Sequence, residues 1–107
     1  MSNKTPLPLS KRLKEARLLA GYSQKELGIM AGIDQFSASA RMNQYETGKH
    51  APNYNTITNI AKTLGLPVAY FYCIEDDLAR LISTWGKLTK KDRECFLEKT
   101  GPTGPTT

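Results

Sequence analysis

The sequence feature that most constrains the fold is a pair of short helical patterns joined by a glycine-bearing connection, in residues 23 to 46. Ser23 can cap the first helix by accepting a backbone N–H bond, and Glu26 three residues later completes a capping box. Apolar residues then recur at the spacing of one buried helical face, at Leu27, Met30 and Ala31. Gly32 ends the pattern where positive φ is wanted, so we expect the turn at residues 32 to 34.

The second helix of this pair has more polar side chains than its packing needs. Met42 and Tyr45 are three residues apart and can both point into a core. The other positions face elsewhere and are Ser39, Ala40, Arg41, Asn43 and Gln44. Apart from the alanine, these side chains are of the kind that bind base edges in the major groove, arginine on guanine and asparagine or glutamine on adenine. The pair of helices therefore favours a protein that reads DNA over one that transforms a small molecule.

Length and composition set the outer limits of the fold. A chain of 107 residues with 39% hydrophobic residues fits one all-helical domain with a modest core. No apolar run approaches the roughly 20 residues that cross a bilayer, and the polar start lacks the apolar stretch of a secretion signal. We therefore expect a soluble, cytoplasmic protein. Cys73 and Cys95 lack zinc-ligand spacing and are expected to be buried or partly buried free thiols.

The positive charge of the chain is unevenly distributed. The net charge is +5, and residues 1 to 74 hold nine Lys and Arg against four acidic residues, whereas the remainder holds six of each. The excess thus belongs to the part that contains the paired helices, as expected where that part meets phosphates. A solvated basic surface would give the same count of charges. The uneven charge favours DNA binding because it coincides with the paired helices.

Apolar stripes predict further helices on both sides of the pair. Before it, Ser10 can cap a helix that ends at Gly21. Its apolar stripe is Leu9, Leu13, Ala16 and Ala20, and its solvated basic residues are Lys11, Arg12, Lys14 and Arg17. After the pair, a gap-free stripe of Ile57, Ile60, Ala61 and Leu64 stops at residues 65 to 67. A short, very apolar helix at residues 68 to 72 completes five helices around one core.

In these features the chain resembles the lambda-repressor-like, Cro/repressor (Xre) family of helix-turn-helix proteins. The residues that carry the resemblance are Arg12-Leu13-Lys14, Gly21 through Leu27, Ala31-Gly32-Ile33, Tyr45 through Lys49 and Leu64-Gly65-Leu66. The resemblance implies an all-α, five-helix domain over residues 9 to 73 that binds double-stranded DNA in a sequence-specific way. We expect a flexible arm at residues 1 to 8 before this domain. After it we expect one or two helices at residues 74 to 100 and a disordered tail at residues 101 to 107.

The same resemblance implies roles for individual residues. Base contacts are implied for Ser39, Ala40, Arg41, Asn43 and Gln44, with Arg41 and Gln44 foremost. Contacts with the DNA backbone are implied for Ser23, Gln24, Lys25, Lys49, His50 and Asn53. Gln24 stands at the start of a helix, where N–H groups also bind a phosphate oxygen. Backbone contacts contribute affinity and register rather than the choice of sequence.

The chain departs from the family in the connection between the paired helices. Thirteen residues separate Gly32 from the glutamate of the aromatic-Glu-x-Gly ending, where the family has about nine. Four extra residues are close to one helical turn. They either extend the second helix at its start, with Asp34 as cap, or extend the turn, with Ser37 as cap. We expect the extended helix, with Phe36 packed inward and Gln35 or Ser37 able to reach DNA.

Several residues have structural explanations. Leu27, Met30, Met42 and Ile60 are expected in the core. Tyr45 is expected to be buried with a bonded hydroxyl, and Glu46 to pair with a basic side chain of the fold, since a carboxylate repels phosphate. Asp76 and Asp77 are expected to cap a helix and interact with its dipole. With one histidine, His50, and no glycine-rich phosphate loop, nucleophile elbow or metal-ligand cluster, neither an enzyme nor a cofactor is expected.

The last third of the chain carries its own apolar stripe, at Leu78, Leu81, Ile82 and Trp85. Thr89 can cap a last helix that runs to Lys99 and carries Phe96 and Leu97. These side chains are buried either on the five-helix core or against a second copy of the chain. Because helix-turn-helix proteins commonly bind DNA as two-fold dimers, we expect the stripe to make or support a homodimer.

The resulting expectation is a transcriptional repressor that binds a two-fold operator as a dimer, with no membrane partner or small-molecule ligand. The alternative is an antitoxin-like interaction module whose C-terminal helices bind a partner protein and which autoregulates. Trp85, Phe96 and the apolar residues 68 to 72 are the surface that such a partner would use.

Overall fold

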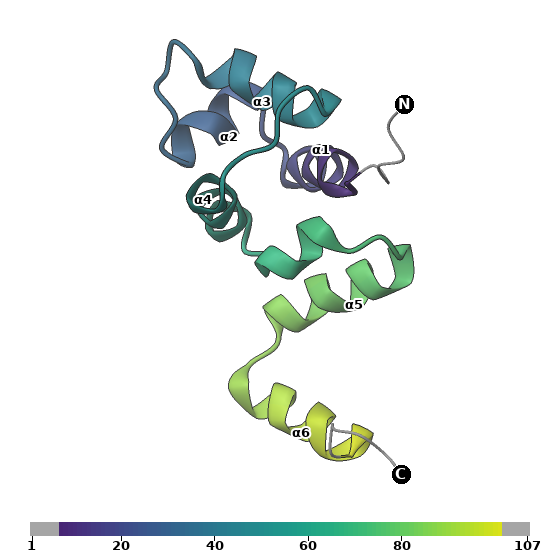
Figure 1. Cartoon of the computed structure of the whole chain (residues 1–107). Helices are drawn as coiled ribbons and strands as arrows, with labels where there is room; N and C mark the ends of the chain where they lie inside the picture. Colours follow the sequence, from purple (N-terminus) through teal and green to yellow (C-terminus); the bar gives the residue numbers. More distant parts are fainter. Residues whose placement is uncertain (1–6, 102–107) are drawn as a thin grey trace, which may run out of the picture.

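The computed structural model describes residues 7–101, which form six α-helices and one 3-10 helix and no strand (Figure 1). The elements are α1 (Leu9–Ala20), α2 (Gln24–Met30), α3 (Ala38–Thr47), α4 (Tyr54–Leu64), the 3-10 helix η1 (Val68–Tyr72), α5 (Asp76–Lys87) and α6 (Lys90–Thr100). The expected arm and tail lie outside the described residues, except for residues 7, 8 and 101. None of the helices in residues 7–101 is long and apolar enough to cross a membrane.

The start of α2 forms as the sequence predicts. Ser23 Oγ accepts the Glu26 N–H at 3.0 Å, and the Ser23 N–H donates to Glu26 Oε1 at 2.8 Å. The bond from the Ser23 backbone N–H, and after it the hydrogen bond from the Ser23 hydroxyl, lower the pKa of the Glu26 carboxyl. Thr89 caps α6 in a similar way, by accepting the Asp92 N–H at 3.1 Å.

The predicted cap of α1 is wrong. Pro8 occupies the cap position, so Ser10 lies within the helix. Its hydroxyl donates to the Tyr45 carbonyl oxygen at 2.8 Å and thus joins α1 to α3. This bond links residues 35 positions apart and leaves no local signature in the sequence.

Gly32 ends α2 as predicted. It has φ 94°, its N–H donates to the Ile29 carbonyl oxygen at 2.9 Å, and the next N–H, of Ile33, reaches the Gly28 carbonyl oxygen at 2.9 Å. This pattern satisfies helix-end carbonyls and needs a left-handed residue, which glycine provides without steric cost.

The core lies between α1, α2, α3, α4 and η1. Its fully buried large side chains are Leu13, Leu27, Met42, Ile57, Ile60 and Phe71. Tyr45 is also buried, and Leu64 packs against this core while partly exposed. Ala20 was predicted to belong to the apolar stripe of α1. This prediction is wrong, because Ala20 is exposed at the end of the helix.

The prediction that Met30 is buried is also wrong, because its side chain is 53% exposed. The buried face of α2 is centred on Leu27, Gly28 and Ala31 instead. A Cβ added to Gly28 would lie 2.9 Å from the Ala38 Cβ, so α2 and α3 are in close contact at this glycine. Met30 lies outside this face and is exposed to solvent.

Two basic residues that were expected on the solvated faces of α1, Arg12 and Arg17, are buried. Arg12 Nε donates to the Cys73 carbonyl oxygen at 2.9 Å, and Arg12 Nη2 donates to the Ile74 carbonyl oxygen at 3.0 Å. Arg12 Nη1 lies 3.0 Å from Asp76 Oδ1. The guanidinium thus satisfies carbonyls that follow η1 and fastens the start of α5 to α1.

The C-terminal helices lead away from this core (Figure 1). α5 packs on η1 and buries Ala79, whereas α6 buries no residue. α6 is held to α5 by the Trp85–Phe96 ring contact, 6.1 Å between centroids, and by Arg93 Nε, which donates to the Trp85 carbonyl oxygen at 3.1 Å. The radius of gyration is 15.9 Å, against about 13 Å for a compact domain of this length. The molecule is therefore elongated.

The two predicted free thiols differ in burial. Cys73 is buried at the end of η1, as expected. Cys95 is exposed, contrary to expectation, because α6 has no buried face that could cover it.

Candidate nucleic-acid interface

The four extra residues of the connection extend the turn and not the helix. α3 begins at Ala38, and the predicted extra turn of helix is wrong. The Asp34 carbonyl oxygen accepts the Ser37 N–H at 3.0 Å, and Asp34 Oδ2 accepts the Phe36 N–H at 3.0 Å. An aspartate that bonds to the backbone two residues ahead closes a tight turn and competes with the helix.

The alternative with Ser37 at the cap position has the correct helix start, although its side chain makes no cap hydrogen bond. The inward packing expected for Phe36 is wrong as well, because its side chain is 88% exposed. Gln35 is exposed beside it, whereas Ser37 is partly buried.

α3 divides cleanly into an inner and an outer side. Ala38, Met42 and Tyr45 face the core. All five residues with an expected base contact lie at least partly at the surface: Ser39, Ala40, Arg41 and Asn43 are exposed and Gln44 is partly buried. The residues Ser39 through Gln44 therefore combine an apolar anchor, Met42, with side chains available to a ligand.

A buried ion pair fixes α3 relative to α1. Arg17 Nε donates to Glu46 Oε2 at 2.6 Å, and Arg17 Nη2 donates to Glu46 Oε1 at 3.0 Å, so the pair is bidentate. Arg17 Nη1 also donates to the Tyr22 carbonyl oxygen at 2.9 Å. The hydrogen bond to Glu46 raises the pKa of Arg17, against the opposing effect of burial. The expected pairing of Glu46 within the fold is confirmed.

The same carboxylate extends its hydrogen bonds to α2. Gln24 Nε2 donates to Glu46 Oε1 at 3.1 Å and lies 3.4 Å from Asn43 Oδ1. Gln24 and Asn43, for which a DNA backbone contact and a base contact were expected, are thus brought side by side. We call Arg17, Glu46, Gln24 and Asn43 the polar network. Sequence reasoning missed Arg17 in it, because its partner lies 29 residues away.

Residues after α3 meet its outer side. Lys49 and His50 are exposed, and the Asn53 side-chain oxygen accepts the Thr56 N–H at 2.9 Å and caps α4. A hollow of ≈ 370 Å³ brings these elements together and is lined by Arg41, Gln44, Tyr45, His50, Ala51, Asn53 and Thr56. Sequence reasoning missed Ala51 and Thr56, which carry no distinguishing pattern.

The basic surface is smaller than the charge count indicates. Arg12 and Arg17 are buried and paired with acids, and Lys11 lies 3.3 Å from Asp76 Oδ1. The exposed basic residues of α1 to α4 and their loops that are not paired in this way are Lys14, Lys25, Arg41, Lys49 and Lys62. Of the expected contacts with the DNA backbone, Ser23, Lys25, Lys49, His50 and Asn53 are exposed, and Gln24 is partly buried.

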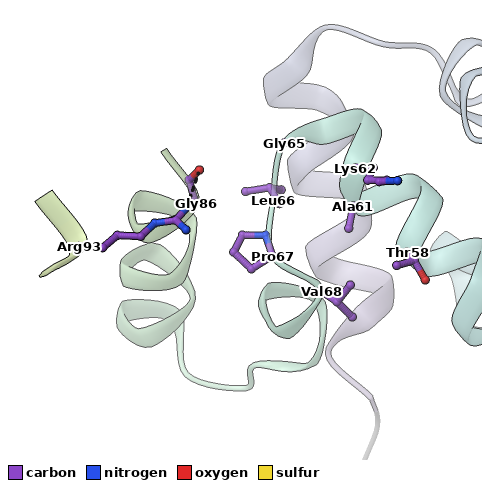
Figure 2. Close-up of a pocket in the computed structure, with 9 residues that line it drawn as sticks. All are labelled: Thr58, Ala61, Lys62, Gly65, Leu66, Pro67, Val68, Gly86 and Arg93. Carbon is purple, nitrogen blue, oxygen red and sulfur yellow. Dashed lines mark hydrogen bonds between the residues drawn. The ribbon is translucent and has the colours of Figure 1, made fainter. Parts of the chain in front are cut away.

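A second hollow, of ≈ 420 Å³, lies between α4 and the C-terminal helices. Figure 2 shows Gly86 of α5 facing Pro67, with Arg93 of α6 beyond it. A Cβ added to Gly86 would lie 2.8 Å from Pro67 Cδ, so the glycine permits this approach. The hollow contains none of the residues with expected DNA contacts.

The apolar stripe of α5 is divided between the core and the surface. Ile82 packs against the core and Trp85 is half-buried, whereas Leu78 and Leu81 are 41% and 47% exposed. The two outward leucines are thus available for contact with a second chain.

The fold and the geometry of α2 and α3 define a helix-turn-helix protein. Residues 13–71 match the helix-turn-helix family, and the chain belongs to that family. It is similar to a solved structure, the crystal structure of transcriptional regulator BswR, with a TM-score of 0.76 and 52% sequence identity. The alignment covers 81% of this chain and 86% of that chain. None of the curated proteins matches.

Proposed function

We propose that this protein is a DNA-binding transcriptional regulator that recognises a specific sequence and represses transcription by occupying a two-fold operator as a dimer. Membership of the helix-turn-helix family and the similarity to a transcriptional regulator support the regulatory role. The observation that carries the proposal is the outer side of α3, where polar side chains stand on a helix whose inner side is locked into the core.

In the proposed complex α3 lies in the major groove. Arg41 and Gln44 provide the foremost base contacts, because guanidinium groups bind guanine and carboxamides bind adenine through paired hydrogen bonds. Ser39, Ala40 and Asn43 complete the base-contacting set. Arg41 and Gln44 line one hollow with His50, so a base-reading group and a phosphate-binding group lie close together.

Contacts with phosphates set the register of α3 in the groove. The start of α2 provides Ser23, Gln24 and Lys25, and the loop after α3 provides Lys49, His50 and Asn53. The polar network supports this assignment, because Gln24 is oriented by Glu46 before DNA binds. A side chain that is already oriented loses less conformational freedom on binding.

The proposed dimer uses the outward part of the α5 stripe. Leu78 and Leu81 are exposed on a helix whose Ala79 and Ile82 pack against the core, and α6 buries no residue of its own. Such helices are stabilised by a second apolar surface. A two-fold dimer would place two copies of α3 about 34 Å apart, in successive major grooves on one side of the duplex.

Fluorescence anisotropy tests the proposal directly. The full chain is titrated onto a duplex from the region upstream of its own gene and onto a shuffled duplex, each across a salt series. Sequence-specific recognition predicts an affinity gap that persists as salt rises, because base contacts release few counterions. The same titration is repeated with duplexes selected from random DNA. If the protein binds all these duplexes and the shuffled duplex equally, with a steep dependence on salt, the proposal is contradicted.

The lack of buried residues in α6 also supports a second candidate, an antitoxin-like module that binds a partner protein and autoregulates. Phe96 and Leu97 are 39% and 48% exposed, and Tyr72 is 43% exposed near the start of α5. Copurification of a second chain in stoichiometric amount supports this candidate. Light scattering that shows a homodimer under the same conditions supports the first.

A further inference from the structure

The turn before α3 presents an aromatic side chain that the proposed contacts leave unexplained. Phe36 is 88% exposed, yet Leu19 on α1 is 87% exposed, so exposure alone does not identify a binding site. The difference between them is position. Phe36 lies two residues before the first residue of the helix that is proposed to enter the major groove.

Backbone hydrogen bonds place Phe36 relative to α3. The Phe36 N–H is held by Asp34 Oδ2, and the Ser37 N–H by the Asp34 carbonyl oxygen, each at 3.0 Å. Ser37 has right-handed helical angles, φ −107° and ψ −12°, and its carbonyl oxygen accepts the Arg41 N–H at 2.9 Å. The turn therefore leads directly into α3, and the Phe36 ring is exposed beside the start of that helix.

Phe36 lies at the N-terminal end of α3, in the turn that leads into the helix. It comes four residues before Ala40 and seven before Asn43 in the sequence. Ala40 and Asn43 are exposed, whereas Ala38 and Met42 are buried on the opposite side. Phe36 thus adds an exposed apolar side chain next to the start of the helix that carries these exposed residues.

We propose that Phe36 makes an apolar contact with the 5-methyl group of a thymine in the major groove, beside the bases read by α3. This inference rests on the proposed function and adds a specificity-determining residue to it. A phenyl ring has no hydrogen-bonding group, and the thymine methyl is the apolar group that base edges present in the major groove. The contact also explains why the sequence that extends the turn carries a solvent-exposed aromatic residue.

Uracil substitution tests this contact. A duplex is first selected from random DNA with the full chain, and each thymine of a half-site is then replaced in turn by deoxyuridine, which lacks only the methyl group. We expect one position at which this replacement weakens binding by about fourfold, the factor for one buried methyl group. Phe36→Ala is expected to weaken binding to the thymine duplex by at least the same factor and to be indifferent to uracil at that position.

Two variants serve as controls. Phe36→Leu keeps an apolar side chain and is expected to keep sensitivity to the methyl group. Leu19→Ala removes an equally exposed apolar side chain on α1 and is expected to bind both duplexes like the wild type. Circular dichroism of each variant verifies that the fold is intact.

A uracil effect that persists undiminished in Phe36→Ala would overturn the inference, as would wild-type affinity of that variant. A change of oligomeric state in Phe36→Ala without DNA would also overturn it, because the side chain would then be a protein contact. If no sequence is selected from random DNA, the proposed function fails and the inference fails with it. If a sequence is selected and Phe36 is not coupled to any thymine methyl, only the inference fails.

Discussion

At the scale of single residues, Glu46 links the packing of the fold to its candidate interface. Its carboxylate holds Arg17 through two hydrogen bonds and Gln24 through a third. The Glu46 and Arg17 side chains are 3% and 10% exposed, so both charges are largely removed from water. The pair therefore orients α1, α2 and α3 relative to one another.

Removal of Glu46 alone is expected to lower the free energy of unfolding by more than the net stabilisation that the Arg17–Glu46 pair provides. Glu46→Ala leaves the Arg17 guanidinium buried and unpaired, and we expect the free energy of unfolding to fall by about 3 to 5 kcal/mol. Urea unfolding followed by circular dichroism measures this loss. Glu94→Ala, on exposed α6, is the control and is expected to change stability by less than about 0.5 kcal/mol. Equal effects of the two substitutions would contradict the structural role of the pair.

At the scale of elements, the contact between α2 and α3 depends on the absence of a side chain at Gly28. A Cβ at this position would meet the Ala38 Cβ at 2.9 Å and the Met42 Cγ at 3.1 Å. Both neighbours are fully buried and cannot move into solvent.

Gly28→Ala is therefore expected to force the two helices apart and to lower the free energy of unfolding by about 1 to 3 kcal/mol. Lys25→Ala, on the exposed side of the same helix, is the matched control. Thermal unfolding compares the two variants. A Gly28→Ala protein that is as stable as the wild type would show that the helices are less closely packed than described.

The attachment of the first residue of α5 to α1 is expected to depend on pH through Asp76. Hydrogen bonds from Lys11 and then from Arg12 lower the pKa of the Asp76 carboxyl in the folded state. A carboxyl with a lowered pKa stabilises the fold above its unfolded pKa, about 3.9, and loses that contribution as the pH falls through the folded value. Stability from this contact is thus constant between neutral pH and about pH 4 and declines below it.

Thermal unfolding between pH 7 and pH 3 measures this dependence. Asp76→Asn is expected to be less stable than the wild type at neutral pH and to approach it in acid. Asp77→Asn is the control, because within residues 7–101 its side chain accepts only the neighbouring Leu78 N–H, at 2.8 Å. A constant difference between Asp76→Asn and the wild type at all pH values would contradict the assigned cause.

The local signals in the sequence predicted the elements well. The Ser23 and Glu26 capping box and Gly32 were correct because each acts within a few residues of its own position. The burial of Arg12 was missed because the carbonyls that it satisfies lie 61 and 62 residues away. The start of α3 was predicted wrongly because four extra residues were taken as one helical turn. The Asp34 carboxylate instead accepts the Phe36 N–H, which favours a tight turn over a helix.

At the scale of the whole molecule, the elongated shape reflects two parts of unequal packing. α1 to η1 share one core, whereas α6 buries no residue and α5 leaves two leucines exposed. We propose that the boundary between the well-packed part and the C-terminal helices lies at about residue 73, where the sequence predicts the end of the DNA-binding domain. The proposed homodimer would cover the exposed part of α5.

Substitution of the two leucines tests that dimer. Leu78→Ser with Leu81→Ser is expected to convert a dimer into a monomer without unfolding α1 to η1, because both side chains lie outside the core. Light scattering coupled to size-exclusion chromatography measures the mass. Leu18→Ser, at a 58% exposed position on α1, is the control. A wild-type protein that is monomeric at high concentration, or a double variant that stays dimeric, would contradict the proposal.

The central claim is that the outer side of α3 reads the base sequence. The most direct measurement is the affinity of the wild type, Arg41→Ala and Lys49→Ala for a selected operator and for every single base-pair substitution of one half-site. Arg41→Ala is expected to lose discrimination at one or two positions, by about 1 to 3 kcal/mol, and to keep it elsewhere. Lys49→Ala is expected to weaken binding to all duplexes by one common factor and to reduce the salt slope by about one. Uniform loss of affinity in both variants would contradict the claim.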